Sequence, residues 1–164
     1  MKPCPSRRKE IAMPSSTRIG NRHLAVDVSS LGAEMQALTS SDGRSWLWTG
    51  EATYWAGRSP ILFPIVGKAA DDKLAIGGAV YPMAQHGFAR RSEFSLAAST
   101  PTMCRHELPA SAATQAVYPF DFLLAVEHAV QGTRFDGDGR SKQPRRKSAA
   151  LRSRLPSGFR LAAA

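Results

Sequence analysis

Three residues of this chain have types and surroundings that suit ligand chemistry: Arg58, His86 and Arg90. A guanidinium held at the edge of a cleft donates several hydrogen bonds, and a neutral imidazole can donate to or accept from a hydroxyl. Arg58 and Arg90 together would form a clamp for an anion or for hydroxyl groups. We therefore take these three as the candidate substrate-binding residues.

Each of the three also has an ordinary structural interpretation. Arg58 can cap backbone carbonyls or pair with a carboxylate, His86 can be a half-buried loop histidine, and Arg90 can be a solvated loop charge. Residue types and spacing alone favour these structural roles. The neighbouring Arg91 is expected to face solvent.

Local sequence suggests how two of these side chains are positioned. Arg58 follows Gly57 at the start of a segment in which Pro60 and Pro64 bracket three apolar residues, so this segment is neither a helix nor a central strand. Gly87 follows His86 and permits an unusual turn that would aim the imidazole inward.

Other groups of residues carry weaker signals. Four aromatic residues can stack on a sugar face, although core or rim packing is their commoner use: Trp46, Trp48, Tyr54 and Trp55. The remaining histidines, His23, His106 and His128, have no spacing that suggests a metal site. The chain has no Cys-x-x-Cys, phosphate loop, dinucleotide fingerprint or serine-nucleophile motif. No metal or cofactor is expected.

Alternating apolar residues predict an all-β domain from about residue 21 to residue 130. The expected strands lie in 23–30, 32–40, 41–48, 73–83, 92–98 and 122–130, and the 41–48 segment is expected to be a turn followed by an aromatic strand. Gly77-Gly78 predicts a hairpin within 73–83. Leu124, Val126 and His128 should share one face, and 107–122 should be a connection with one helical turn. Many short strands favour an antiparallel sandwich.

Charge is unevenly distributed along the 164 residues, whose formal net charge is +9. Residues 1–12 carry four basic and one acidic residue, and residues 134–164 carry nine basic and two acidic ones. The globular part between them holds nine basic and ten acidic residues, so no folded basic face is expected and no specific nucleic-acid binding follows. A basic tail that touches polyanions nonspecifically remains an alternative.

Compartment signals are few. No apolar run approaches the ~18–20 residues that span a membrane, and the basic head lacks the apolar stretch of a secretory signal. Cys4 and Cys104 do not make a disulfide framework. A cytoplasmic protein without membrane attachment is therefore expected.

The order of four sequence blocks resembles the aldose 1-epimerase family (galactose mutarotase-like proteins), in its bacterial aldose-epimerase-like branch. The blocks are SSLGAEMQAL, DGRSWLWTGEATYWAGRSPILFPIVGK, YPMAQHGFARRSEF and AATQAVYPFDFLLAVEHAV. The resemblance covers about residues 21–135. It implies a partial galactose mutarotase-like β-sandwich (supersandwich). It also implies ligand-binding roles for Arg58, His86 and Arg90 in place of the structural roles that residue types alone favour, because in the family their equivalents line the sugar pocket.

The resemblance also implies an activity, the interconversion of the α and β anomers of an aldose. A carboxylate base removes the proton of the C1 hydroxyl while an imidazole acid protonates the ring oxygen, and the ring opens and recloses. No metal or organic cofactor is needed. A related branch acts on hexose 6-phosphates, where arginines hold the phosphate, and a noncatalytic carbohydrate-binding protein is a further alternative.

The chain departs from the family pattern in its second half. The Gly-x-His-Pro-x-Phe segment of the family's acid histidine and the base glutamate near the C-terminus are not found, so no catalytic residue is assigned and an inactive, truncated form is expected. We expect a basic head at 1–16, an aldose 1-epimerase-like part at 17–135 and a disordered basic tail at 136–164. One codon choice for LPSGFRLA, shifted by one base, reads Phe-His-Pro-Gly-Phe-Gly-Trp, which suggests a frameshift near residues 133–139.

Overall fold

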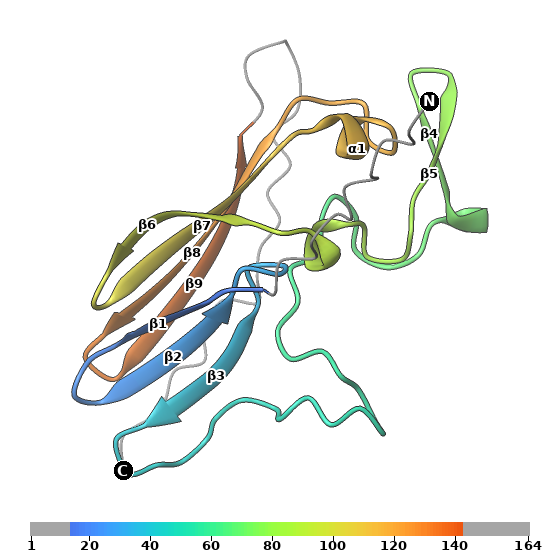
Figure 1. Cartoon of the computed structure of the whole chain (residues 1–164). Helices are drawn as coiled ribbons and strands as arrows, with labels where there is room; N and C mark the ends of the chain where they lie inside the picture. The colour runs from blue at the N-terminus through green and yellow to red at the C-terminus, as the bar shows by residue number, and fades with distance from the viewer. Residues whose placement is uncertain (1–13, 143–164) are drawn as a thin grey trace, which may run out of the picture.

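The computed structural model describes residues 14–142, and its strands form three antiparallel sheets (Figure 1). The first sheet pairs β1 (Ser16–Gly20), β2 (Leu24–Ser29) and β3 (Met35–Ser40) in that order. The second is a hairpin of β4 (Lys73–Ile76) and β5 (Ala79–Pro82). The third has the order β6 (Ser95–Thr100), β7 (Met103–Pro109), β8 (Leu123–Gln131) and β9 (Arg134–Lys142). Helical structure is limited to η1 (Ala70–Asp72), η2 (Ala89–Arg91) and α1 (Ala112–Gln115). The expected all-β antiparallel architecture is confirmed.

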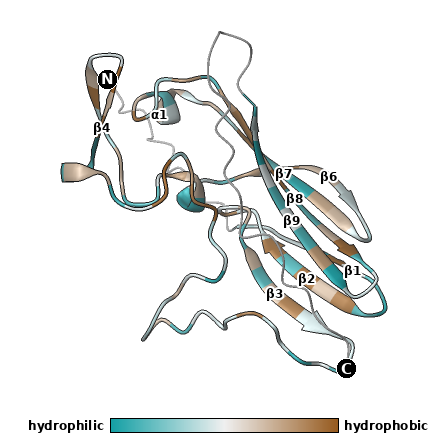
Figure 2. Cartoon of the chain, turned by 180° about the vertical axis from the view of Figure 1, so that it is seen from behind, coloured by the Kyte–Doolittle hydropathy of each residue, from teal (hydrophilic) through white to brown (hydrophobic). Residues whose placement is uncertain are grey.

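The three-stranded and four-stranded sheets face each other as two layers (Figure 1). Leu24, Val26 and Val28 alternate inward along β2, as the sequence pattern predicts, and brown patches alternate with paler ones on this strand in Figure 2. They pack with residues of the opposite layer, among them Cys104 and Val130. Alternation of this kind buries one face of each sheet and leaves the other to solvent.

A second apolar cluster lies beyond the β1–β3 sheet and holds the loops that carry the candidate site. Phe63 is 3% exposed at its centre. Its ring lies 5.8 Å from that of Phe88, 5.9 Å from that of Tyr118 and 5.1 Å from that of Phe122. Ile61 and Phe63 are thus the anchors of the segment bracketed by Pro60 and Pro64. This segment forms no helix or strand, as expected, apart from an isolated bridge between Phe63 and Gly87.

The predicted hairpin is confirmed as β4 and β5, which project from the body of the fold (Figure 1). Gly77 and Gly78 form its turn with φ of 58° and 84°. Positive φ at both central residues is what a two-residue hairpin turn requires, and glycine adopts it without a steric penalty. The expected helical turn between β7 and β8 is also present as α1, with Ser111 as its N-cap.

The prediction of an aromatic strand within 41–48 is wrong. One bridge joins Thr39 to Ser45, and the chain then leaves the sheet. The aromatic side chains find local partners instead: Trp46 donates through Nε1 to Ser40 Oγ at 2.9 Å and lies under the Arg44 guanidinium at 4.2 Å. Backbone turn contacts and a cation–π pair thus replace the neighbouring strand that the pattern implied.

The structure also adds three strands to those expected, and the first of them, β1, lies before the region that was predicted to be β. β7 was not anticipated, although Cys104, His106 and Leu108 alternate inward along it. β9 pairs residue by residue with β8 from Arg134 to Lys142, so regular pairing extends seven residues past the boundary that composition indicates at 135. Figure 2 shows β9 largely teal, because its charged residues face solvent at a sheet edge. The rest of the expected tail, 143–164, and residues 1–13 of the expected head lie outside the described residues.

No helix within residues 14–142 is long and apolar enough to cross a membrane.

Candidate sugar site

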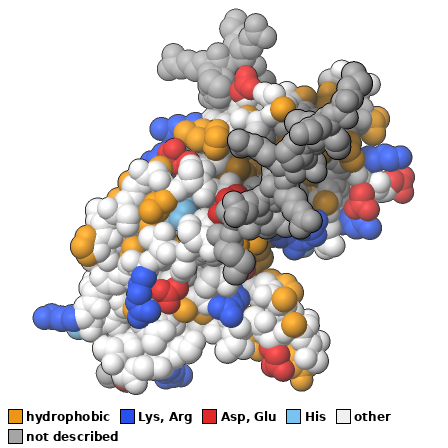
Figure 3. All heavy atoms as spheres, viewed as in Figure 1, with side chains coloured by type: hydrophobic (Ala, Val, Ile, Leu, Met, Phe, Trp, Pro, Cys, Tyr) orange, Lys and Arg blue, Asp and Glu red, His pale blue; other side chains and the backbone are white. Residues whose placement is uncertain are grey.

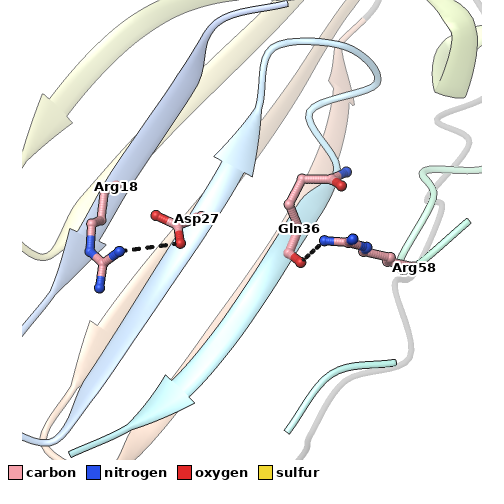
Figure 4. A network of polar contacts seen from close by, with 4 residues as sticks. All are labelled: Arg18, Asp27, Gln36 and Arg58. Atoms are coloured by element: carbon pink, nitrogen blue, oxygen red, sulfur yellow. Dashed lines mark hydrogen bonds and ion pairs between the residues drawn. The ribbon is translucent and has the colours of Figure 1, made fainter. Parts of the chain in front are cut away.

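Arg58 is held by the turn and strand that precede it in sequence. Its backbone N–H donates to Glu34 Oε1 at 2.7 Å, and its Nη1 donates to the backbone carbonyl of Gln36 on β3 (Figure 4). Gly50 leaves room for this side chain, since a Cβ there would lie 2.7 Å from Arg58 Nε. Arg58 is half-buried and therefore fixed, as a binding guanidinium must be.

The hydrogen bond from Arg58 Nη1 to the Gln36 carbonyl agrees with part of the structural role considered for Arg58, the capping of backbone carbonyls. It occupies only one of the three guanidinium nitrogens. Nε and Nη2 have no hydrogen-bond partner within the described residues, and no carboxylate there lies within ion-pair distance of Arg58. The side chain therefore keeps its charge and several donors available for a ligand.

His86 lies in the unusual turn that Gly87 was expected to permit. Its φ is +66° and that of Gly87 is +73°. The His86 backbone N–H donates to Gly67 O at 2.7 Å, and the Gly67 N–H donates to His86 Nδ1 at 2.9 Å. A backbone N–H can only donate, so Nδ1 accepts and the neutral ring carries its hydrogen on Nε2. The half-buried imidazole thus carries its N–H on Nε2, which lies 3.3 Å from the side-chain amide of Gln85.

Arg90 lies in η2, four residues after His86. Its Nη2 donates to Gln85 O at 3.1 Å, which ties the arginine to the histidine turn. Its Nε is buried without a partner among the described residues. A buried donor without a partner is unusual in a folded protein, and this nitrogen is covered in the structure as it stands.

The structure brings His86 and Arg90 together in one loop and places Arg58 on a separate segment. No hydrogen bond or ion pair between described residues joins Arg58 directly to the other two. Arg91 is exposed, as expected. Beside the His86 turn lies an open depression of about 430 Å³ lined by Lys68, Asp72, Pro82, Met83, Ala84 and Gln85.

The four aromatic residues singled out in the sequence lie on the segment between β3 and η1 and are largely exposed: Trp46 36%, Trp48 41%, Tyr54 77% and Trp55 49%. Orange side chains gather on this projecting part of the molecule at the lower right of Figure 3. Trp48 donates through Nε1 to Trp55 O at 2.8 Å and meets the Tyr54 ring edge-on at 6.4 Å. These rings therefore do not pack in the core.

The expectation that His128 shares one face of its strand with Leu124 and Val126 is confirmed, whereas the burial of His106 on β7 was not anticipated. His106 is 0% and His128 3% exposed, on neighbouring strands of the inner face. Burial lowers the pKa of His106, and burial together with the nearby His106 lowers the pKa of His128 to about 4. Both rings are thus neutral at pH 7. No group of three or more His, Cys, Asp or Glu within residues 14–142 is placed to hold a metal ion.

A second hollow, a charged groove of about 130 Å³, lies on the outer face of the four-stranded sheet. Its lining comes from β7, β8 and β9 and includes Arg105, Glu127 and Arg140, so it shares no residue with the candidate site.

The family model of aldose 1-epimerase matches residues 15–149 of the chain, which is most of its length. The chain belongs to the aldose 1-epimerase family. Plasmid-encoded protein LacX of Lactococcus lactis subsp. lactis is 29% identical to it over 117 residues, which are 68% of this chain and 39% of LacX. The match to the family model extends past the β8–β9 turn and so includes β9.

Solved structures of this family have the same fold. A galactose mutarotase-like protein from Lactobacillus casei superposes with a TM-score of 0.76 at 30% identity, covering 79% of this chain and 44% of that protein. A galactose mutarotase related enzyme from Lactobacillus acidophilus gives a TM-score of 0.71 at 30% identity, covering 77% and 44%. The chain thus spans less than half the length of these family members. The expected galactose mutarotase-like β-sandwich is confirmed for the part that aligns.

Proposed function

We propose that this chain binds an aldose sugar through Arg58, His86 and Arg90, which is the binding step of the anomer interconversion that the aldose 1-epimerase family catalyses. The observation that carries the proposal is the family match over residues 15–149. It is supported by Arg58, whose Nε and Nη2 have no hydrogen-bond partner among the described residues, and by the placement of His86 and Arg90 in one loop. Guanidinium N–H groups and the His86 Nε2–H suit the hydroxyl oxygens of a sugar. The family members of known structure described above are a galactose mutarotase-like protein and a galactose mutarotase related enzyme, which is consistent with a hexose ligand.

The reaction separates into binding and proton transfer. Ring opening needs a base at the C1 hydroxyl and an acid at the ring oxygen, with pKa values near the working pH. Arginine does not release its proton at such a pH, so Arg58 and Arg90 can only hold and orient the sugar. We propose that the described residues supply this binding function without a complete acid and base pair, and that the chain alone is inactive as an epimerase.

A hexose 6-phosphate is the second candidate ligand. Neither Arg58 nor Arg90 has a carboxylate within ion-pair distance among residues 14–142. Two arginines that keep their charge available suit a phosphate dianion, which accepts short charge-assisted hydrogen bonds. Comparison of D-glucose with D-glucose 6-phosphate as ligands separates the two candidates.

Two measurements test the proposal. Proton NMR of freshly dissolved α-D-galactose and α-D-glucose should show anomerisation at the rate of the buffer blank, and acceleration would overturn the proposed inactivity. Titration of the protein with the same sugars and D-glucose 6-phosphate should show binding that Arg58→Ala and Arg90→Ala each weaken by about tenfold. Arg91→Ala is the matched control, because Arg91 is the exposed neighbour of Arg90. Equal losses in all three variants would contradict the assigned site.

A further inference from the structure

The turn between β2 and β3, residues 31–34, contacts both segments that carry the candidate arginines. On one side, Gly32 N donates to Ser92 O at 2.8 Å, and Leu31 bridges Glu93. Gly32 has a φ of +70°, and a Cβ there would lie 3.0 Å from Arg90 O. The backbone of Arg90 is therefore packed directly against this turn.

The other side of the turn holds the Arg58 segment through one side chain. Glu34 Oε1 accepts from Arg58 N at 2.7 Å and from Ser59 N at 2.9 Å. Two further bonds reach the strand that follows the turn, because Ser59 Oγ donates to Met35 O at 3.1 Å and Arg58 Nη1 donates to Gln36 O. Only the Glu34 bonds join a side chain of the turn to the backbone of residues 58 and 59.

The Glu34 carboxylate is committed to these backbone groups. It makes no ion pair with any described residue, so its role is to accept the two amide hydrogens. Hydrogen bonds from backbone N–H groups to a carboxylate are charge-assisted and are stronger than neutral ones. A carboxylate with two parallel N–H donors fixes the direction of the chain at that point.

We propose that Glu34 is a positioning residue that sets where Arg58 lies relative to Arg90. Glu34 thereby sets the spacing between the ligand groups that the two arginines bind. The assignment of a ligand rests on the proposed function. The fixing of the Arg58 segment by Glu34 does not, and it is measured separately below. The turn lies within the SSLGAEMQAL block, residues 29–38. The contacts of the turn give this block a role in the site that the sequence alone does not reveal.

Three substitutions of Glu34 distinguish the effect of losing its hydrogen-bond acceptor from the effects of losing its charge and of shortening its side chain. Glu34→Gln keeps an oxygen at the same distance, Glu34→Asp shortens the side chain by one methylene group, and Glu34→Ala removes the acceptor. Glu51→Gln is the matched control, because the Glu51 side chain is exposed and makes no hydrogen bond or ion pair with another described residue.

Amide hydrogen exchange measured by NMR on the whole chain tests the positioning itself. Exchange at Arg58 and Ser59 should quicken by about tenfold or more in the Ala and Asp variants, stay near wild type in Glu34→Gln, and be unchanged in the control. Unchanged exchange in Glu34→Asp would overturn the proposal. If Glu34→Ala fails to fold, the comparison of the Gln and Asp variants decides the question.

Ligand titration tests the consequence for binding, with D-galactose and D-glucose 6-phosphate as probes. The Asp variant should bind the ligand about tenfold more weakly than wild type at an unchanged urea midpoint, and Gln should restore most of the affinity. Weakened binding with a parallel fall in the midpoint would reduce Glu34 to a structural residue. If the wild type binds neither probe, the proposed function fails, and the exchange rates still decide whether Glu34 fixes the segment.

Discussion

Gly87 lies close to the backbone of Phe63 at the candidate site. A Cβ at residue 87 would lie 2.0 Å from Phe63 O, and the φ of +73° adds strain for any other residue. Gly87→Ala should therefore lower the free energy of unfolding by more than about 3 kcal/mol, since main chain must move to relieve the overlap. Urea unfolding followed by circular dichroism measures this.

Gly43 provides the matched control for that substitution. It also has a positive φ, +83°, but nothing lies within 4 Å of a Cβ there. Gly43→Ala should lower the free energy of unfolding only by the backbone strain, about 1 kcal/mol. Similar losses for the two variants would show that positive φ, and not the approach to Phe63, makes Gly87 necessary.

The buried histidines predict a loss of stability in acid. His128 has a pKa of about 4 in the folded chain and the ordinary value of 6.5 when unfolded. Because its folded pKa is lowered, its neutral form favours the fold above pH 6.5, and this stability is lost as the pH falls from 6.5 toward 4. The loss from this residue is about 3 kcal/mol. Urea unfolding at intervals between pH 7.5 and pH 4 measures the slope.

Substitution shows whether His128 causes that slope. His128→Leu should flatten the decline below pH 6.5, because leucine has no proton to gain. His23→Gln should retain it, since His23 lies at the surface end of β2 and is only half-buried. His106 contributes to the lowering of the His128 pKa, the buried Cys104 is its cross-strand partner on β7, and the Phe135 ring is stacked 5.8 Å away. A slope unchanged by His128→Leu would exclude His128 as its source.

Residue types indicated the candidate site only in part. The turn at His86 and Gly87 was predictable because glycine after a polar residue favours positive φ, and the structure has it. The role of Glu34 was not, because its partners are backbone N–H groups of residues 58 and 59, which have no residue-specific signature in a sequence. A carboxylate that binds main chain reads like any other surface glutamate until the fold is known.

At the scale of elements, the predictions that succeeded rest on strong local patterns. The Gly77-Gly78 turn fixes a hairpin by itself, and β2 and β8 show alternation over six or more residues. The aromatic segment after β3 failed because aromatic residues favour strands only where a neighbouring strand offers a surface to pack on. Here the segment lies outside the sheet, and Trp46 pairs with Arg44 within its own loop.

The strand β9 shows why composition misplaced the boundary of regular structure. Its residues alternate charged with small or aromatic side chains, which reads as a polar, unstructured segment. Pairing with all of β8 satisfies the backbone groups on one side of β9, and Phe135 packs against His128 on the inner face. Edge strands carry charge on their exposed side, so their composition resembles that of a loop.

At the scale of the whole molecule, the two edges of the four-stranded sheet differ in charge. The edge strand β9 carries Arg134, Asp136, Asp138, Arg140 and Lys142, whereas the opposite edge strand β6 has the sequence SLAAST with no charged residue. Charges on an edge strand oppose pairing with another chain, and an uncharged edge leaves its backbone groups open to such pairing.

We therefore expect the chain to self-associate through β6, and Leu96, 49% exposed on that strand, is the residue to change. Leu96→Lys places a charge on the open edge and should shift sedimentation toward monomer at concentrations where the wild type associates. Val66→Lys is the control, because Val66 is 76% exposed but lies in a loop. If Val66→Lys disperses the protein equally well, general apolar exposure drives the association. If only Leu96→Lys does so, strand pairing at β6 drives it, since the two variants add the same charge at exposed apolar positions.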